Sequence, residues 1–361
     1  METSTAKYVV SELEYPSWYS KVYYIFNYTI CILQCFGFAI NLVHFSILSR
    51  PQMRSNLIYR LMIGICICDL LTQINTFVLF TPFWIRDSSK QEETCTRRYV
   101  YFEAFMYLHG ISLLDITQRG ASWMALFMAL YRMLSVKFPM SVRIQKLTKP
   151  VAAFWTIFGV MIFTSFTTWM VQSRRTIAEY DWDFDCNNDV ILLNDTNEVR
   201  YAHYIPDEDA EIQVKLVAVY GFIKLLPSLI DPVLTIFLIL ELRKASRRRK
   251  NSGIRENDKT ENTTKLVIFV TISFFLLEVP NGLSHIGDAF FTSNPKMRTI
   301  IFLIPVFAEC LPIVNSSTHL FICLLMSSQY RTTAKTIFKY FVPKRQNAIV
   351  VEEFKSTAGA H

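Results

Sequence analysis

The sequence predicts an all-α membrane protein, a seven-transmembrane helix bundle followed by a short amphipathic eighth helix. Hydrophobic residues make up 52% of the 361 residues and charged residues only 19%, a balance typical of a chain surrounded by lipid more than by water. Seven apolar stretches are each longer than the roughly 20 residues that a helix needs to cross hydrocarbon. They cover residues 23–48, 57–84, 102–136, 151–172, 214–242, 266–291 and 299–326.

The seven stretches are predicted to be helices, because a helix satisfies its own backbone in lipid and the alternating pattern of barrel strands is missing from the sequence. One bundle domain therefore covers residues 23–326, after an extracellular N-terminal segment of residues 1–22. Prolines in the last three stretches predict kinks, because proline removes a helix hydrogen bond. These prolines are Pro227, Pro232, Pro280, Pro305 and Pro312.

Residues 327–342 predict an amphipathic helix on the cytoplasmic membrane surface. Tyr330, Ala334, Ile337 and Phe341 fall on one face at helical spacing, with basic residues beside them. Residues 343–361 show no periodicity and are predicted to be a disordered cytoplasmic tail.

Basic residues set the expected orientation of the bundle. Arg50, Lys146 and Arg248 represent the basic loops after the first, third and fifth stretches, and the positive-inside rule makes this side cytoplasmic. The acid-rich segment after the fourth stretch then faces outward, together with the N-terminus. The net charge of +7 thus combines a basic inner face with an acidic outer face, so it does not indicate nucleic-acid binding. We expect a multi-pass protein of the plasma membrane.

Two cysteines and one sequon lie in the predicted outer loops. Cys95 and Cys186 fall in the first and second of these loops, where an oxidising compartment favours a disulfide between them. Asn194 begins an Asn-Asp-Thr sequence in the same acidic loop and is the expected glycosylation site.

Polar side chains inside the membrane are costly, so they predict functional positions or packing pairs. One hydrated polar centre is expected in the bundle, where it would hold either a sodium ion at Asp69, Asn315 and Ser316 or bridging water. The residues of this network are Asn41, Asp69, Asn315, Ser316 and His319.

A second group of polar residues predicts an outward-opening ligand cavity. Asp115 and Arg119 are four residues apart on one helix face, where they either serve the cavity or neutralise each other. The excess of acid over base favours a cationic or amidated ligand. The candidate ligand-binding residues are Asp115, Gln118, Arg119, Glu278, Asn281, His285, Asp288 and Glu309.

The order of these motifs resembles that of the rhodopsin-like G-protein-coupled receptors, and in particular the nematode Srw serpentine receptors, relatives of FMRFamide-type peptide receptors. Asn41, Asp69 and Trp155 match marker residues of spans one, two and four, and Arg132 matches the arginine that contacts the G protein. The Srw subgroup is indicated by several strings in order. They are Lys224 to Ser228, Leu238 to Lys244, Thr264 to Phe269, Leu277 to Gly282, Asn315 to His319 and Met326 to Arg331.

The sequence also departs from the wider rhodopsin-like pattern. Tyr131 stands where an acid usually precedes the arginine, and Glu278 replaces a tryptophan before Pro280. The segment from His319 to Cys323 takes the place of an Asn-Pro-x-x-Tyr motif, which puts its tyrosine-dependent water network in question.

The resemblance implies a receptor that binds an extracellular peptide or small molecule and couples to a heterotrimeric G protein through Tyr131, Arg132 and Pro139. It is not expected to be an enzyme or to need a cofactor. The acidic outer residues favour an amidated basic neuropeptide, and the alternative is a chemosensory receptor for environmental small molecules. A transporter is a more distant alternative, because no duplicated halves are visible.

Overall fold

The computed structural model describes residues 17–77, 101–179, 201–204, 206–251 and 310–341, with short pieces between 268 and 283. Its elements in chain order are α1 (Ser17–Leu48), α2 (Pro51–Arg54), α3 (Leu57–Asn75), α5 (Tyr101–Lys137), α6 (Val142–Leu147), α7 (Pro150–Gln172), β1 (Thr176–Glu179), β2 (Tyr201–Tyr204), α8 (Asp207–Asn251), α11 (Cys310–Met326) and α12 (Ser328–Phe341).

Four described helices are long and apolar enough to cross a membrane. They contain Tyr28–Leu48, Leu57–Asn75, Pro150–Gln172 and Glu211–Glu241. α5 adds a helix of 37 residues. In α11 and α12 the segments Leu311–Leu325 and Ser328–Phe338 are bent by 99° relative to each other and pass the same test as one broken span. Each of the seven predicted stretches is helical wherever the structure describes it.

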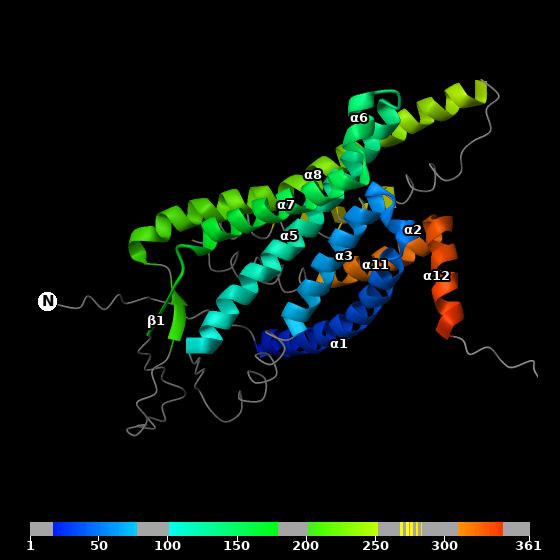
Figure 1. The fold of residues 1–361 in the computed structure, drawn as a ribbon. Helices are drawn as coiled ribbons and strands as arrows, with labels where there is room; N and C mark the ends of the chain where they lie inside the picture. Colours follow the sequence, from blue (N-terminus) through cyan, green and yellow to red (C-terminus); the bar gives the residue numbers. More distant parts are fainter. Residues whose placement is uncertain are drawn as a thin grey trace, which may run out of the picture.

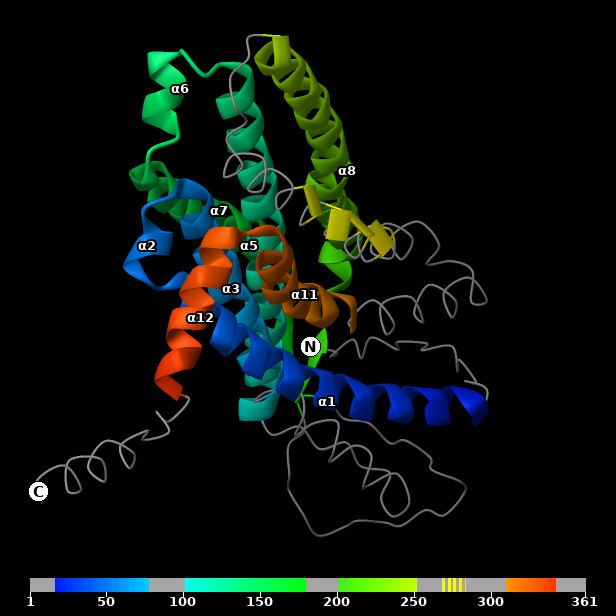
Figure 2. The same cartoon turned by 90° about the vertical axis from the view of Figure 1, so that its right-hand side faces the viewer.

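α3 and α5 form the centre of the bundle. α1 and α11 pack on one side of this pair, and α7 and α8 pack on the other (Figures 1 and 2). The helices approach closely where α3 carries Gly64, because a Cβ atom there would lie 2.8 Å from Met124 Sδ and 3.0 Å from Ile157 Cδ1. Membrane helices associate without a hydrophobic driving force. Small residues at their crossings let the helices approach closely and gain van der Waals packing energy.

α7 turns an aromatic face outward. Phe154, Trp155, Phe158 and Trp169 are all more than half exposed, as expected for side chains in contact with lipid. The ring of Trp155 lies edge-on to its neighbours, with centroid distances of 5.5 Å to Phe154 and 6.4 Å to Phe158. The tryptophan that the resemblance marks in span four therefore lies on the lipid side of the bundle.

The all-α prediction missed one element, a two-stranded hairpin after α7. β1 and β2 pair antiparallel, with Thr176 opposite Tyr204 and Glu179 opposite Tyr201. Both strands contact α5. The short Thr-Ile and Tyr-x-x-Tyr segments have the β-branched and aromatic residues that favour strands, but each strand is only 4 residues long and the partner lies far along the chain.

The fifth helix is longer than predicted. α8 continues to Asn251, beyond the expected end at residue 242, and its last turns project past α6 in Figure 1. The extension is rich in Arg, Lys and Ala, which are strong helix formers even without packing partners. α12 buries Tyr330, Ala334 and Ile337 and exposes Arg331 and Lys335, in the pattern that its sequence predicts.

Candidate functional site

Polar side chains gather at three levels of the bundle. We name them the central network (between α1, α3 and α11), the arginine cluster (between α5, α7 and α8) and the Arg132 cleft (at the basic end of the helices).

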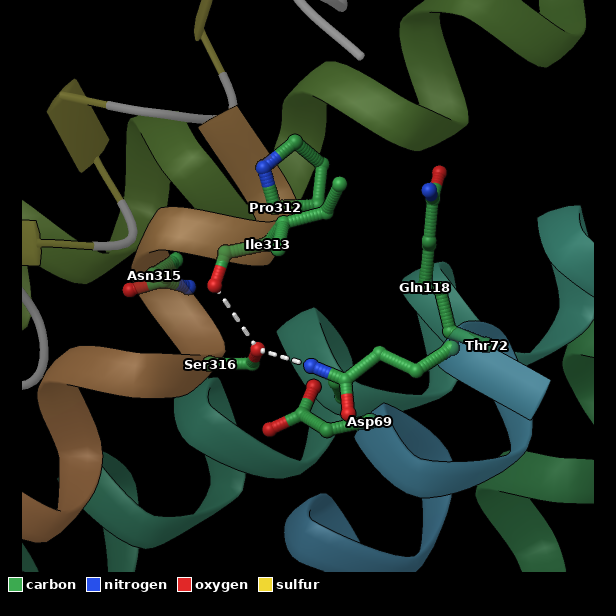
Figure 3. Close-up of a pocket in the computed structure, with 9 residues that line it drawn as sticks. Asp69, Thr72, Gln118, Pro312, Ile313, Asn315 and Ser316 are labelled. Atoms are coloured by element: carbon green, nitrogen blue, oxygen red, sulfur yellow. Dashed lines mark hydrogen bonds between the residues drawn. The ribbon is translucent and has the colours of Figure 1, made fainter. Parts of the chain in front are cut away.

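The central network is organised around Ser316 of α11. Its Oγ accepts a hydrogen bond from Asn41 Nδ2 at 3.1 Å. It also accepts one from Gln73 Nε2 at 2.9 Å and donates to the Ile313 carbonyl at 3.0 Å, as the dashed lines in Figure 3 show. Asn41 Nδ2 also lies 3.3 Å from Gln73 Oε1. Gly37 makes this approach possible, because a Cβ atom there would lie 2.8 Å from Gln73 Nε2. One serine therefore joins three helices.

Asp69 on α3 and His319 on α11 belong to the same network. Asp69 Oδ2 lies 3.3 Å from His319 Nδ1, in a place where His319 is almost completely buried. The predicted network thus comes together, and it gains Gln73, which the sequence analysis missed. The sequence did carry a signal for Gln73, because this residue lies four residues after Asp69 and therefore on the same helix face.

A cavity of about 20 Å³ lies inside the central network, lined in part by Asp69, Asn315, Ser316 and Gln118 (Figure 3). Among the described residues, Asn41 Oδ1 and Asn315 Oδ1 have no hydrogen-bond partner. A space of this size accommodates one water molecule, which needs two to four polar partners. The oxygen atoms suit a small cation as well, so the sodium site at Asp69, Asn315 and Ser316 stays a prediction.

The arginine cluster is centred on Arg119, which is 2% exposed. Its guanidinium group turns to α7, where it donates to Thr167 Oγ1 at 2.8 Å, to the Thr164 carbonyl at 3.1 Å and to Thr168 Oγ1. Its Cζ also lies 4.4 Å from the ring centroid of Tyr220 on α8. Several hydrogen bonds and an aromatic face are what a buried cation requires.

Asp115 does not use the guanidinium of Arg119 as its partner. Its carboxylate faces Lys224 of α8, with Oδ1 and Nζ 4.0 Å apart and the lysine only 3% exposed. Arg119 donates to the Asp115 backbone carbonyl instead. The i to i+4 spacing allowed a neutral pair on one helix, whereas the structure gives Arg119 its side-chain hydrogen-bond partners on α7 and places Lys224 of α8 opposite Asp115.

The Arg132 cleft has a volume of about 410 Å³ and opens at the basic end of the bundle. Its lining is polar and includes hydroxyl and amide side chains beside the arginine. The lining residues are Ser55, Asn56, Leu57, Ile58, Tyr131, Arg132, Ser135, Thr148 and Gln329. The Tyr131 hydroxyl lies 2.6 Å from Thr156 Oγ1 on α7, so this tyrosine positions α5 against α7 as well as lining the cleft. Pro139 lies beyond the end of α5 and does not line the cleft.

Several predicted site residues lie outside the described part of the chain. They are the candidate ligand contacts Glu278, Asn281, His285, Asp288 and Glu309, the cysteines Cys95 and Cys186, and the glycosylation sequon at Asn194.

Together the bundle, the buried polar network and the open cleft define a polytopic helical membrane protein with polar side chains in its interior. A family model described as the serpentine type 7TM GPCR chemoreceptor Srw matches residues 26–341, and the chain belongs to this family. The family is one of seven-transmembrane receptors, not of enzymes, and membership implies a membrane setting, ligand binding and G-protein coupling. A comparison with curated proteins finds no match.

Proposed function

We propose that this chain is a G-protein-coupled receptor in which ligand binding at the arginine cluster changes the population of conformations at the Arg132 cleft. The Arg132 cleft is the main support for this proposal. Its described lining combines a guanidinium with hydroxyl and amide groups and includes no acid, so it favours carboxylate and carbonyl groups of a protein partner. A ligand shifts the equilibrium by binding one conformation more tightly than the other.

The ligand we favour is a small polar or acidic molecule from the environment. The family description names a chemoreceptor. Among the described residues of the arginine cluster, Arg119 and Lys224 outnumber Asp115, whose carboxylate already faces Lys224. This charge balance favours an anionic group over the basic peptide that the sequence predicts.

The amidated basic neuropeptide remains the second candidate. It is supported by the acid-rich segment of residues 181–211, which would attract a cationic peptide to the outer face. The two candidates carry opposite charges and are therefore separable by experiment.

Substitution of Lys224 by Met tests the ligand class. Cells displaying the wild-type receptor or Lys224→Met would be challenged with a panel of small carboxylic acids and a panel of amidated basic peptides, with G-protein activation as the readout. We expect an acid to activate the wild type and to lose about tenfold or more in potency in Lys224→Met, because a charge-assisted hydrogen bond contributes about 1.5–3 kcal/mol.

Lys215→Met is the matched control. Lys215 lies on the same helix, but its side chain is 72% exposed and, among the described residues, its partner is Glu211 one turn away, at 2.6 Å. Activation by the peptides alone, with both variants equally potent, would reject the acidic ligand and leave the neuropeptide.

A further inference from the structure

The turn between α11 and α12 is held by a chain of four side chains. The hydroxyl oxygens of Tyr59 on α3 and Ser327 in the turn lie 2.6 Å apart. The backbone N–H of Tyr330 donates to the same Ser327 oxygen at 3.1 Å. The Tyr330 hydroxyl in turn lies 2.7 Å from Nδ1 of His44 on α1. These four residues, here called the corner latch, join α3, α12 and α1 around the turn.

The corner latch is shielded from solvent. Tyr330 is 0% exposed, His44 1%, Tyr59 2% and Ser327 4%. The rings of His44 and Tyr330 also pack, with centroids 5.6 Å apart at an angle of 46°. Because water cannot replace a lost partner at such a place, breaking either hydroxyl contact leaves a polar group unsatisfied.

Further hydrogen bonds hold the turn itself. Arg331 Nη1 donates to the carbonyls of Leu324 at 3.1 Å and Leu325 at 2.9 Å, which satisfies groups that the end of α11 would otherwise leave open. Gln329 Nε2 donates to the Gln52 carbonyl of α2 at 2.9 Å. These bonds join the turn and α12 into one body, which is itself hydrogen-bonded to α2.

This body forms one wall of the Arg132 cleft. Gln329 lines the cleft directly. Leu57 and Ile58, which directly precede Tyr59 on α3, line the cleft as well, so the corner latch also borders it on this helix. A displacement of the turn would therefore change the width of the cleft.

We propose that the corner latch holds the Arg132 cleft narrow, and that Tyr330 is a positioning residue that determines how often the cleft opens. The proposal rests on G-protein coupling at this cleft. A buried hydrogen bond contributes about two- to tenfold to an equilibrium, so loss of the Tyr330 hydroxyl raises the open population by this factor.

The first test measures opening without any G protein. Ser135→Cys places a reporter thiol in the cleft, and its labelling rate by a maleimide is followed in receptor membranes, with the chain lacking this substitution as background. Adding Tyr330→Phe, which keeps the ring and removes the hydroxyl, is expected to speed labelling about two- to tenfold. Thr333→Val is the control. Thr333 lies on the same helix and is 7% exposed, but within the described part of the chain its hydroxyl bonds the Gln329 carbonyl of its own helix and no other element.

A substitution of His44, the partner of the Tyr330 hydroxyl, makes the test specific for this contact. His44→Phe alone should speed labelling to a similar extent, and the double variant with Tyr330→Phe should add nothing further, because both changes remove one hydrogen bond. An additive increase, or a rate in Tyr330→Phe no faster than in Thr333→Val, would overturn the corner latch. If Tyr330→Phe does not reach the membrane, Tyr59→Phe breaks the other contact and carries the same expectation and the same contrary result.

Ligand-free G-protein activation by the same variants then separates the two proposals. Faster labelling together with higher basal activation supports both. Faster labelling without any change in activation leaves the corner latch intact and rejects coupling at this cleft. Unchanged labelling rejects the corner latch whatever the activation shows.

Discussion

At the scale of single residues, the pairing of Asp69 with His319 bears on what fills the central cavity. His319 Nδ1 lies 3.3 Å from Asp69 Oδ2, so it competes with a cation for this carboxylate oxygen. The other polar side chains that line the cavity of about 20 Å³ are all neutral: Thr72, Gln73, Gln118, Asn315 and Ser316. Of the two occupants predicted from the sequence, this arrangement favours water.

We therefore expect no sodium-specific stabilisation of the purified receptor. Its melting temperature should be the same in sodium chloride and in potassium chloride at equal ionic strength, because only an ion that binds the folded state raises it. A rise of several degrees in sodium that disappears in Asp69→Asn would contradict this expectation and establish the sodium site.

The residues of the central network were predictable because intramembrane polar groups are rare and each must find a partner. Asn41, Ser316 and His319 were found in this way. The partners of Arg119 were not predicted, because threonines such as Thr164, Thr167 and Thr168 are individually ordinary in a membrane helix. Only their spacing along one face of α7 marks them, and the sequence does not state which helix lies opposite.

At the scale of the elements, the crossing of α3 with α5 and α7 depends on Gly64. Replacement by Leu would drive a side chain into Met124 and Ile157, which already lie within 3.0 Å of a Cβ atom at this position. We expect Gly64→Leu to lower the free energy of unfolding by about 1–3 kcal/mol, the usual cost of overpacking.

Gly159→Leu provides the matched comparison on α7. A Cβ atom there meets nothing within 4 Å, so the leucine extends into lipid and costs no packing. Surface display and thermal unfolding in detergent would measure both variants. Equal melting temperatures for the two would show that the helices do not cross as closely as described.

The helices themselves were well predicted, because an apolar stretch longer than the bilayer has few alternatives to a helix. Their ends were less predictable. α8 runs nine residues past its expected end, from 242 to Asn251, because the basic segment that follows is also a good helix former. The hairpin was missed, because its strands pair across the long segment between Glu179 and Tyr201.

At the scale of the whole molecule, clusters of polar side chains occupy three levels of the bundle. The arginine cluster joins α5, α7 and α8, the central network joins α1, α3 and α11, and the Arg132 cleft lies at the basic end. Family membership was already indicated by the order of the sequence motifs and is confirmed over residues 26–341. The amidated basic neuropeptide that the sequence favours stays a prediction. The ligand class depends on which charges face each other, and spacing along the chain does not show the pairing of Asp115 with Lys224.

The measurement that tests the central claim most directly is nucleotide exchange on purified heterotrimeric G proteins in membranes containing the receptor. The wild type is compared with Arg132→Ala at equal surface density. Arg143→Ala controls for the lost charge, because Arg143 is an exposed residue of α6 outside the cleft lining. The account predicts that the wild type accelerates exchange on at least one class of G protein, that Arg132→Ala loses about tenfold or more of this rate, and that Arg143→Ala keeps it. Equal rates for the wild type and Arg132→Ala, or no exchange on any G protein, would contradict it.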